Sequence, residues 1–380
     1  MSDAMRVYTK MQTALKKFLT NVSQARLEVM ALMMSALVRK GECHLTQLAR
    51  VAPSKAKTES THRRFQRFLS CDGVESSALM VPFAHPLLHA FEGKTLRLAL
   101  DVSQIGRGCV VLMLGLLYKG RLLPLTWQVE QGEKGHWSAL KHVAFAEQVK
   151  QLLGDRKDVV LLGDGEYDNI DFLRYLSREC GWDFVVRTAK NTLLHQAHEE
   201  KPQQIQYALP VKEGQTLSAS ECKVTAQAFG PLHAVAHWKL KQKQPWYLLS
   251  TFPEPHHSLN LYRKRFLIET FFSDQKSRGF RIDKSHLSCP LRLSRLLLLC
   301  CLSYLWLVYL GIRLVAEGKV DEVDRSKKRQ DKSLFQIGFS WLERQLKNGG
   351  RFRISFELSQ RLVLADIWLA RYESPHATVM

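Results

Sequence analysis

A change of hydrophobic period at residue 94 constrains the fold of this 380-residue chain more than any other feature. The segment TLRLALDVS alternates apolar and polar residues, as a half-buried strand does. CVVLMLGLLY and LLPLTWQVE follow it as two strands joined by a tight turn. Amphipathic helical segments then alternate with the short apolar runs DVVLLGDG and WDFVVRT. The order β-β-β-α-β-α-β predicts an α/β fold with a mixed sheet: three antiparallel strands, then crossover connections flanked by helices.

The regions on either side of this predicted sheet have a different pattern. Residues 1–90 carry apolar residues at helical spacing, so they predict a helical N-terminal domain. Residues 190–255 are more polar, with short strand-like pieces, and predict a β-rich insertion within an α/β domain spanning 91–318. Residues 319–380 predict a charged linker followed by a helical tail.

One apolar stretch, residues 296–312, raises the question of a membrane span. It has 17 residues between two arginines, which is the short limit for crossing a bilayer, and the chain has no similar stretch. We therefore expect a buried core helix over 291–316 and no membrane association. The N-terminus lacks the apolar core of a signal peptide, and the eight cysteines include no CxxC pair. These features favour reduced thiols and a cytoplasmic location.

The charge balance favours a polyanionic partner. Lys and Arg total 55 against 36 for Asp and Glu, a formal net charge of +19, and nucleic acid is the commonest partner for such a surplus. HLTQLARV and STHRRFQRFLS predict two helices of the helix-turn-helix type. Arg63, Arg64 and Arg67 would then share a surface that can meet phosphates. The turn signature is weak, so a charged helix face without a DNA role is the alternative.

Two aspartates lie where functional groups gather in an α/β sheet. Asp101 closes the alternating strand and Asp164 closes a buried one, so neighbouring strands would bring the two carboxylates together. Such acids repel at close range unless a cation lies between them, and Mg²⁺ prefers oxygen ligands. Two ions held by three carboxylates can activate a nucleophile and stabilise the leaving oxygen in phosphodiester chemistry.

The third carboxylate is expected from the segment YRKRFLIETFFSDQK. On a helical wheel, Tyr262, Arg265, Glu269 and Lys276 fall in one narrow stripe, and apolar residues cover much of the remaining circumference. Arginine and lysine suit a phosphate backbone, and tyrosine can bond a phosphate or stack on a base. The alternative is a solvated ion-pair stripe, because Arg265 and Glu269 are four residues apart.

These spacings resemble a known family. Tyr262-x2-Arg265-x3-Glu269-x6-Lys276 matches the YREK signature of the IS4-type DDE transposases at every position. The triad of that family is matched, in order and context, by three acids: Asp101, Asp164 and Glu269. The β-rich segment lies where such transposases carry an insertion, and the run beginning at Trp246 resembles their Trp-x-Leu-Leu-Thr-Thr segment. The resemblance covers roughly residues 40–320.

The resemblance implies an RNase H-like fold and a DNA transposase that acts on the terminal inverted repeats of an insertion sequence. It implies two Mg²⁺ or Mn²⁺ ions bound by the triad, hydrolysis that leaves a 3′-OH, and attack of that hydroxyl on target DNA, in some relatives through a hairpin. The implied DNA contacts are Tyr262, Arg265, Lys276 and Trp246, the last stacking on a flipped base. A homodimer on paired double-stranded ends is implied as well, in the bacterial cytoplasm and associated with the nucleoid when bound to DNA.

One departure from the family pattern leaves alternatives open. Many relatives have Asp-x-Gly-Phe/Tyr after the second aspartate, whereas this chain has Asp164-Gly-Glu-Tyr. Glu166 and Asp168 are therefore substitutes to consider for Asp164, and Trp238 is a rival to Trp246 for the stacking role. Two other functions also stay open: a DNA-binding protein that has lost catalysis, and an RNase H-like nuclease without strand transfer.

Overall fold

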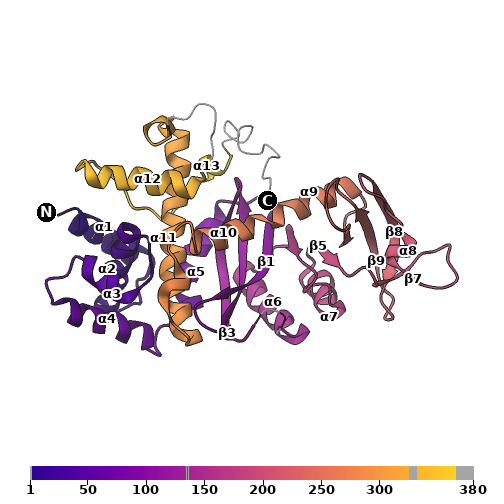
Figure 1. Cartoon of the computed structure of the whole chain (residues 1–380), viewed down its shortest axis with the longest axis horizontal. Coiled ribbons are helices and arrows are strands. Elements are labelled where there is room, and N and C mark those ends of the chain that lie inside the picture. The colour runs from indigo at the N-terminus through magenta and orange to yellow at the C-terminus, as the bar shows by residue number, and fades with distance from the viewer. Residues whose placement is uncertain (1, 134, 136, 325–331, 365–380) are drawn as a thin grey trace.

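A computed structural model describes residues 2–133, 135, 137–324 and 332–364. Among these residues a ten-stranded mixed sheet has the order β3-β2-β1-β4-β5-β10-β9-β8-β6-β7 (Figure 1). The strands are Leu96–Ile105 (β1), Cys109–Tyr118 (β2), Arg121–Gln131 (β3), Val159–Gly163 (β4), Asp183–Thr188 (β5), Leu193–His195 (β6), Gln203–Gln204 (β7), Thr216–Val224 (β8), Phe229–His237 (β9) and Trp246–Ser250 (β10).

The first five strands confirm the predicted order and the mixed α/β class. β1, β2 and β3 form an antiparallel meander, and β4 pairs parallel with β1 on one side and with β5 on the other. The sheet thus has three antiparallel strands followed by two that join it in parallel pairing. Strand β4 is buried along its whole length, which explains why its sequence is a continuous apolar run rather than an alternating one.

The β-rich insertion is confirmed in its strand content, and it extends the central sheet. Strand β10 pairs antiparallel with β5 on one edge and with β9 on the other, so the hydrogen-bond ladder continues from the first five strands into the insertion. The insertion and the N-terminal helices consequently lie at opposite ends of the sheet (Figure 1).

The predicted helical N-terminal region is confirmed. Its helices are α1 (Asp3–Phe18), α2 (Gln24–Lys40), α3 (Leu45–Val51), α4 (Thr58–Ser70) and α5 (Ser76–His89). The connections between strands contain α6 (Ala139–Leu153), α7 (Ile170–Arg174) with a π-helical continuation (Tyr175–Cys180), and the short α8 (Ile205–Ala208). Asn169 caps α7, since its side chain accepts a hydrogen bond from the backbone N–H of Asp171.

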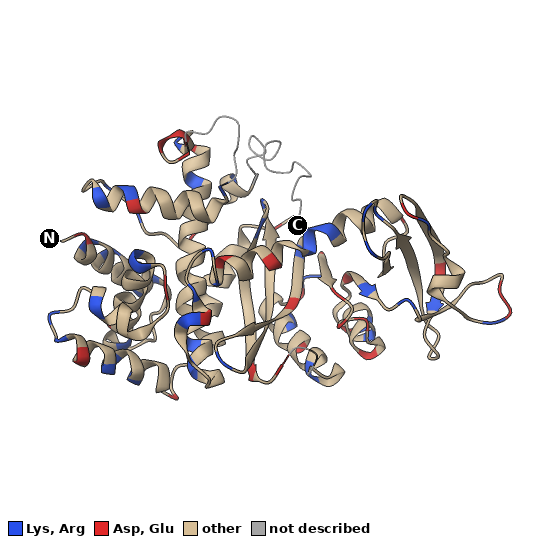
Figure 2. Cartoon of the chain, in the orientation of Figure 1, with Lys and Arg blue, Asp and Glu red and all other residues tan. Residues whose placement is uncertain are grey.

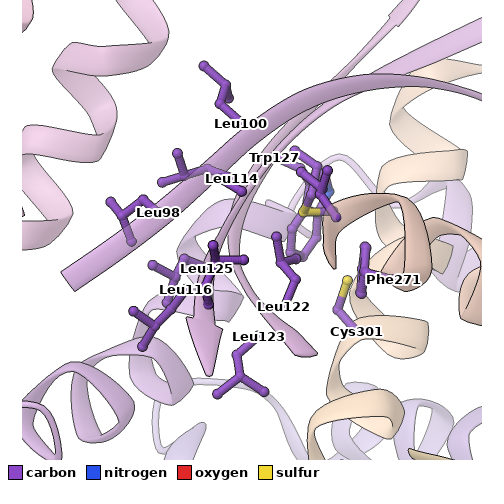
Figure 3. Close-up of a cluster of buried hydrophobic side chains, with 14 of the residues drawn as sticks. Leu98, Leu100, Leu114, Leu116, Leu122, Leu123, Leu125, Trp127, Phe271 and Cys301 are labelled. Atoms are coloured by element: carbon purple, nitrogen blue, oxygen red, sulfur yellow. The ribbon is translucent and has the colours of Figure 1, made fainter. Parts of the chain in front are cut away.

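The apolar stretch that resembled a membrane span forms the core helix α11 (Pro290–Ala316). By length and composition it is the one helix among the described residues that could cross a bilayer, yet 94% of its most apolar window is buried. Figure 3 shows Cys301 of α11 and Phe271 of α10 (Leu267–Gln275) close to Leu122 and Trp127 of β3. The expectation of a core helix is therefore confirmed.

The C-terminal region packs on the far end of α11 through two glycines. A Cβ added to Gly338 of α12 (Leu334–Lys347) would lie 2.0 Å from the carbonyl oxygen of Leu307, and one added to Gly311 would lie 2.0 Å from that of Leu334. Only glycine permits such close approach of two helix backbones. The short α13 (Gln360–Leu364) follows, which confirms a partly helical tail; residues 325–331 of the predicted linker and 365–380 lie outside the described residues.

A buried acid fastens α10 to the sheet. Asp274 is 2% exposed, and its carboxylate accepts a hydrogen bond from Arg121 of β3 at 3.3 Å. Burial raises the pKa of Asp274 from 3.8 to about 6, although Arg121 and Arg278 oppose the shift. The folded protein thus holds this proton more tightly than the unfolded chain does.

This pKa predicts a pH-dependent stability. Since the folded pKa is raised, the contribution of Asp274 is fully present below about pH 4 and is lost as the pH rises through about 6, a change of about 3 kcal/mol. Asp274→Asn should therefore gain stability relative to the parent across that window, as measured by urea unfolding at a series of pH values. Asp155→Asn, at an exposed position, is the control; a difference for Asp274→Asn that does not vary with pH would contradict the prediction.

Candidate active site

Asp101 and Asp164 lie at the same level on adjacent strands. In the parallel pairing of β1 with β4, Leu96 is opposite Val159 and Ala99 is opposite Leu162. Continuing that register two residues further places Asp101 level with Asp164. Asp164 directly follows β4, as predicted, whereas the expectation that Asp101 ends its strand is wrong: β1 continues to Ile105 because β2 still pairs with it.

The segment that carries Glu269 is broken into two helices, which corrects the single helix drawn on the wheel. Helix α9 (Pro255–Arg265) ends at Phe266, α10 begins at the next residue, and Lys276 lies beyond the end of α10. The predicted stripe is also not a solvent-facing one, because Tyr262 is 1% and Arg265 5% exposed. Its polar groups instead face β1.

Arg265 brings two of the predicted triad residues together. Its Nη1 donates to Oδ2 of Asp101 at 3.1 Å, and its Nη2 donates to Oε1 of Glu269, also at 3.1 Å. Asp101 is buried, and its Oδ1 accepts a second hydrogen bond from the backbone N–H of Val102. Glu269 is half exposed, so the ion pair spans the boundary between the core and the surface. The ion pair of Arg265 with Glu269 is thus present, but it is not the solvated pair of that alternative, because Arg265 is buried and Asp101 shares the same guanidinium.

The electrostatics of this cluster favour a bound cation. Burial alone would lower the pKa of Arg265, yet Tyr262, Asp101, Asp164 and Glu269 together hold the pKa above its usual value. All three predicted triad acids therefore act on one guanidinium. Carboxylates gathered in this way need positive charge near them, and their oxygen donors suit Mg²⁺ or Mn²⁺.

Lys276 is held beside the same strand. Its Nζ donates to Oγ of Ser103 at 2.8 Å, and its ammonium lies 5.9 Å from the centroid of the Phe272 ring. Ser103 lies two residues after Asp101, so both side chains point to the same face of β1. Our sequence reasoning missed Ser103, although its position two residues from a predicted metal ligand was the available signal.

Tyr262 and Trp246 form an aromatic group next to the cluster. The Trp246 ring stacks on Phe266 with centroids 5.7 Å apart and meets the edge of Tyr262 at 5.1 Å. Trp246 is half-buried and packs against these two rings. The rival, Trp238, donates its indole N–H to the carbonyl of Gln242 after β9.

The two acids considered as substitutes for Asp164 have other contacts. The backbone N–H of Glu166 donates to Oδ1 of Asp164, so the turn after β4 orients that carboxylate. Asp168 accepts a hydrogen bond from Thr188 of β5, which directs it toward that strand. Asp164 is thus the acid level with Asp101, while the roles of all three stay predictions.

A buried histidine and tyrosine lie behind Asp164. His142 is 2% exposed and packs 4.9 Å from Tyr167, centroid to centroid. Burial lowers the pKa of His142 to about 4, partly opposed by the charge of Asp164, so the imidazole is neutral at pH 7. Sequence reasoning did not single out His142, because nothing in an amphipathic helix distinguishes a buried histidine from an exposed one.

Arg63, Arg64 and Arg67 all lie on α4, after the turn that separates it from α3. Arg63 and Arg67 are exposed, whereas Arg64 pairs with Glu28 of α2 at 3.6 Å. The two predicted helices are therefore confirmed, and the exposed arginines lie outside the helical core. Figure 2 shows these basic positions along α4.

The residues present fit divalent metal binding in their donor chemistry. Asp101, Asp164 and Glu269 offer only carboxylate oxygens, as hard cations prefer. Over the described ranges, no three His, Cys, Asp or Glu side chains are already arranged around one point as metal ligands. Arg265 lies between Asp101 and Glu269 instead, so metal binding requires these carboxylates to exchange its hydrogen bonds for the ion.

Fold and site together define an α/β protein with a carboxylate centre on a mixed sheet. The sequence matches the family described as "Transposase DDE domain" over residues 106–306, which is more than half of the chain. The chain belongs to this family of DDE transposases. The matched region includes Asp164, Glu269 and Lys276 and begins five residues after Asp101.

Comparisons with solved structures and with proteins of curated function add no further family assignment. A solved structure described as "Cryo-EM structure of piggyBac transposase synaptic complex with hairpin DNA (SNHP)" is 12% identical, covering 98% of this chain and 80% of that chain with a TM-score of 0.44. No protein of curated function matches the sequence.

Proposed function

We propose that this protein is an IS4-type DNA transposase that binds the terminal inverted repeats of an insertion sequence and carries out metal-dependent strand cleavage and strand transfer. The observation that carries the proposal is the single guanidinium of Arg265, which bonds Asp101 and Glu269 while Asp101 lies level with Asp164. Two acids far apart in the sequence thus bond one guanidinium, and the charge of a third, Asp164, acts on the same group, in a chain of the DDE transposase family.

In this proposal Asp101, Asp164 and Glu269 hold two Mg²⁺ or Mn²⁺ ions. Bound there, the ions supply activation of the attacking hydroxyl and stabilisation of the leaving oxygen. Asp101 is positioned by its strand and by the N–H of Val102, and Asp164 by the turn N–H of Glu166. Glu269 lies on α10 and is half exposed, so it is the proposed ligand with the greatest freedom to adjust its position.

The cations around the acids contact DNA in the proposed reaction. Lys276, docked on Ser103, lies beside the strand that carries Asp101, where a scissile phosphate would bind. Arg265 can bond a phosphate once metal ions take over its carboxylates. Trp246 offers the indole that stacks on an unstacked base, with Phe266 and Tyr262 as its support. While Tyr262 is buried, it affects DNA binding only indirectly, by supporting the ring of Trp246.

The proposal is tested with a plasmid that carries the gene together with its native flanking DNA. We expect the purified protein with Mg²⁺ to release the flanked segment with 3′-OH ends at inverted repeats and to join it to target DNA, through a paired-end homodimer. Cleavage without joining would instead support the nuclease alternative. DNA binding without either reaction would support a protein that has lost catalysis.

A further inference from the structure

We propose that the groove between α4 and the beginning of α11 is a docking site for the DNA sugar-phosphate backbone, built jointly by the N-terminal helices and the catalytic region. The groove has a volume of ≈ 690 Å³. It is lined by Ser60, Arg63, Arg64, Gln66, Arg67, Ser70 and Arg292. The inference deepens the proposed transposase function, because it assigns a ligand class to a surface away from the carboxylates.

The α4 side of the groove is one face of the helix. Ser60, Arg63, Arg67 and Ser70 recur at intervals of three and four residues, so their side chains lie above one another. Phe65 and Phe68 are buried on the opposite side of α4 against the helical core. The exposed face is therefore set by the packing of the apolar one.

The other side of the groove comes from α11, which belongs to the core around the sheet. Arg292 is exposed in the first turn of α11. Ser294 in the same turn accepts a hydrogen bond from the indole N–H of Trp127 in β3 at 3.0 Å. The position of Arg292 is thus tied to the sheet that carries the acids.

A buried arginine holds the two walls together. Arg295 is 4% exposed; its Nη1 donates to the carbonyl of Leu69 at 2.7 Å, and its Nε donates to that of Val74 at 2.8 Å. Leu69 lies in the last turn of α4, whose carbonyls lack helical partners. Arg295 therefore joins the end of α4 to α11, and the groove keeps its shape without a ligand.

The chemistry of the lining identifies the ligand. The described residues that line the groove include four arginines with hydroxyl and amide groups, and neither an acidic nor an aromatic side chain. Arginine forks and hydroxyls bond phosphate oxygens, whereas base stacking needs aromatic rings. Figure 2 shows basic residues on α4 and on the adjoining end of α11. The groove is consequently suited to follow a DNA backbone without reading its sequence.

The test is the salt dependence of binding to a short labelled DNA duplex of arbitrary sequence. Each phosphate contact contributes about 0.9 to the slope of log K against log salt, so Arg292→Ala and Arg67→Ala should each lower the slope by about one. Arg292→Lys keeps the charge and should retain most of the slope. Arg351→Ala removes an exposed arginine that follows α12 and does not line the groove, and should leave the slope as in the parent.

An unchanged slope in both alanine variants would overturn the groove assignment, whatever the protein does catalytically. Metal-dependent cleavage by the control Arg351→Ala should match the parent, because Arg351 lines neither the groove nor the carboxylate cluster. If the alanine variants lower the salt slope but the parent protein does not cleave DNA, the groove assignment stands and the proposed function is contradicted. The two proposals therefore fail by different measurements.

Discussion

Glu269→Gln is expected to abolish Mg²⁺-dependent strand cleavage and to leave DNA binding at the parent level. The substitution keeps the size of the side chain and its ability to accept a hydrogen bond from Arg265, but it removes the negative charge that a metal ion requires. Removal of one group that stabilises transition-state charge costs about 10²–10³-fold in rate, and loss of a metal ligand should cost at least that much. Cleavage of flanking DNA and gel-shift binding measure the two effects.

Glu254→Gln is the matched control for this variant. Glu254 precedes α9 in the same segment and is exposed, so its replacement changes the net charge equally without touching the cluster. The control should cleave as the parent does. Cleavage by Glu269→Gln at the rate of Glu254→Gln would exclude Glu269 from the metal site.

The order of the sheet could be predicted from the sequence because local patterns reported it directly. The unbroken apolar run in β4 reflects burial on both faces of the sheet. The alternation in β1 predicted a half-buried strand and was wrong in this respect, because β1 is exposed only at Arg97 and Gln104. The length of β1 could not be predicted in this way. Asp101 looked terminal because it interrupts the apolar pattern, but β2 continues the hydrogen-bond ladder past it to Ile105.

The geometry of the candidate site could not be predicted from the sequence. A helical wheel assumes a continuous helix, and the break at Phe266 lies between Arg265 and Glu269 without a proline or glycine to signal it. The wheel also gives only which residues share a face. That this face turns toward β1, and that Arg265 is buried between Asp101 and Glu269, depends on tertiary packing.

The same limit applies to surfaces assembled from distant segments. Arg67 and Arg292 are more than two hundred residues apart, and the sequence singled out Arg67 but not Arg292. Their shared groove depends on Arg295, whose buried bonds to Leu69 and Val74 have no local sequence signal. Charge composition predicted that such a surface would exist, and only the packing of α4 on α11 gave its location.

Arg265→Met is expected to lower stability strongly in the absence of divalent metal and to make stability depend on Mg²⁺. The parent guanidinium forms ion pairs with Asp101 and Glu269, and Asp101 is only 8% exposed. Removing one partner of a buried ion pair costs about 3–5 kcal/mol, because the remaining charge loses its compensation. The free energy of unfolding in EDTA should fall by an amount of this order, as measured by urea denaturation.

Magnesium should then restore part of the lost stability, since an ion that binds only the native state stabilises it by mass action. The gain on adding Mg²⁺ should be larger in Arg265→Met than in the parent, where the ion must first displace Arg265 from the carboxylates. Arg263→Met, at an exposed position two residues earlier on α9, controls for the loss of an arginine. Equal Mg²⁺ effects in parent and variant would mean that Arg265 and the ion do not compete for the same acids. A larger effect in the variant would identify Arg265 as the group that balances the carboxylates until metal arrives.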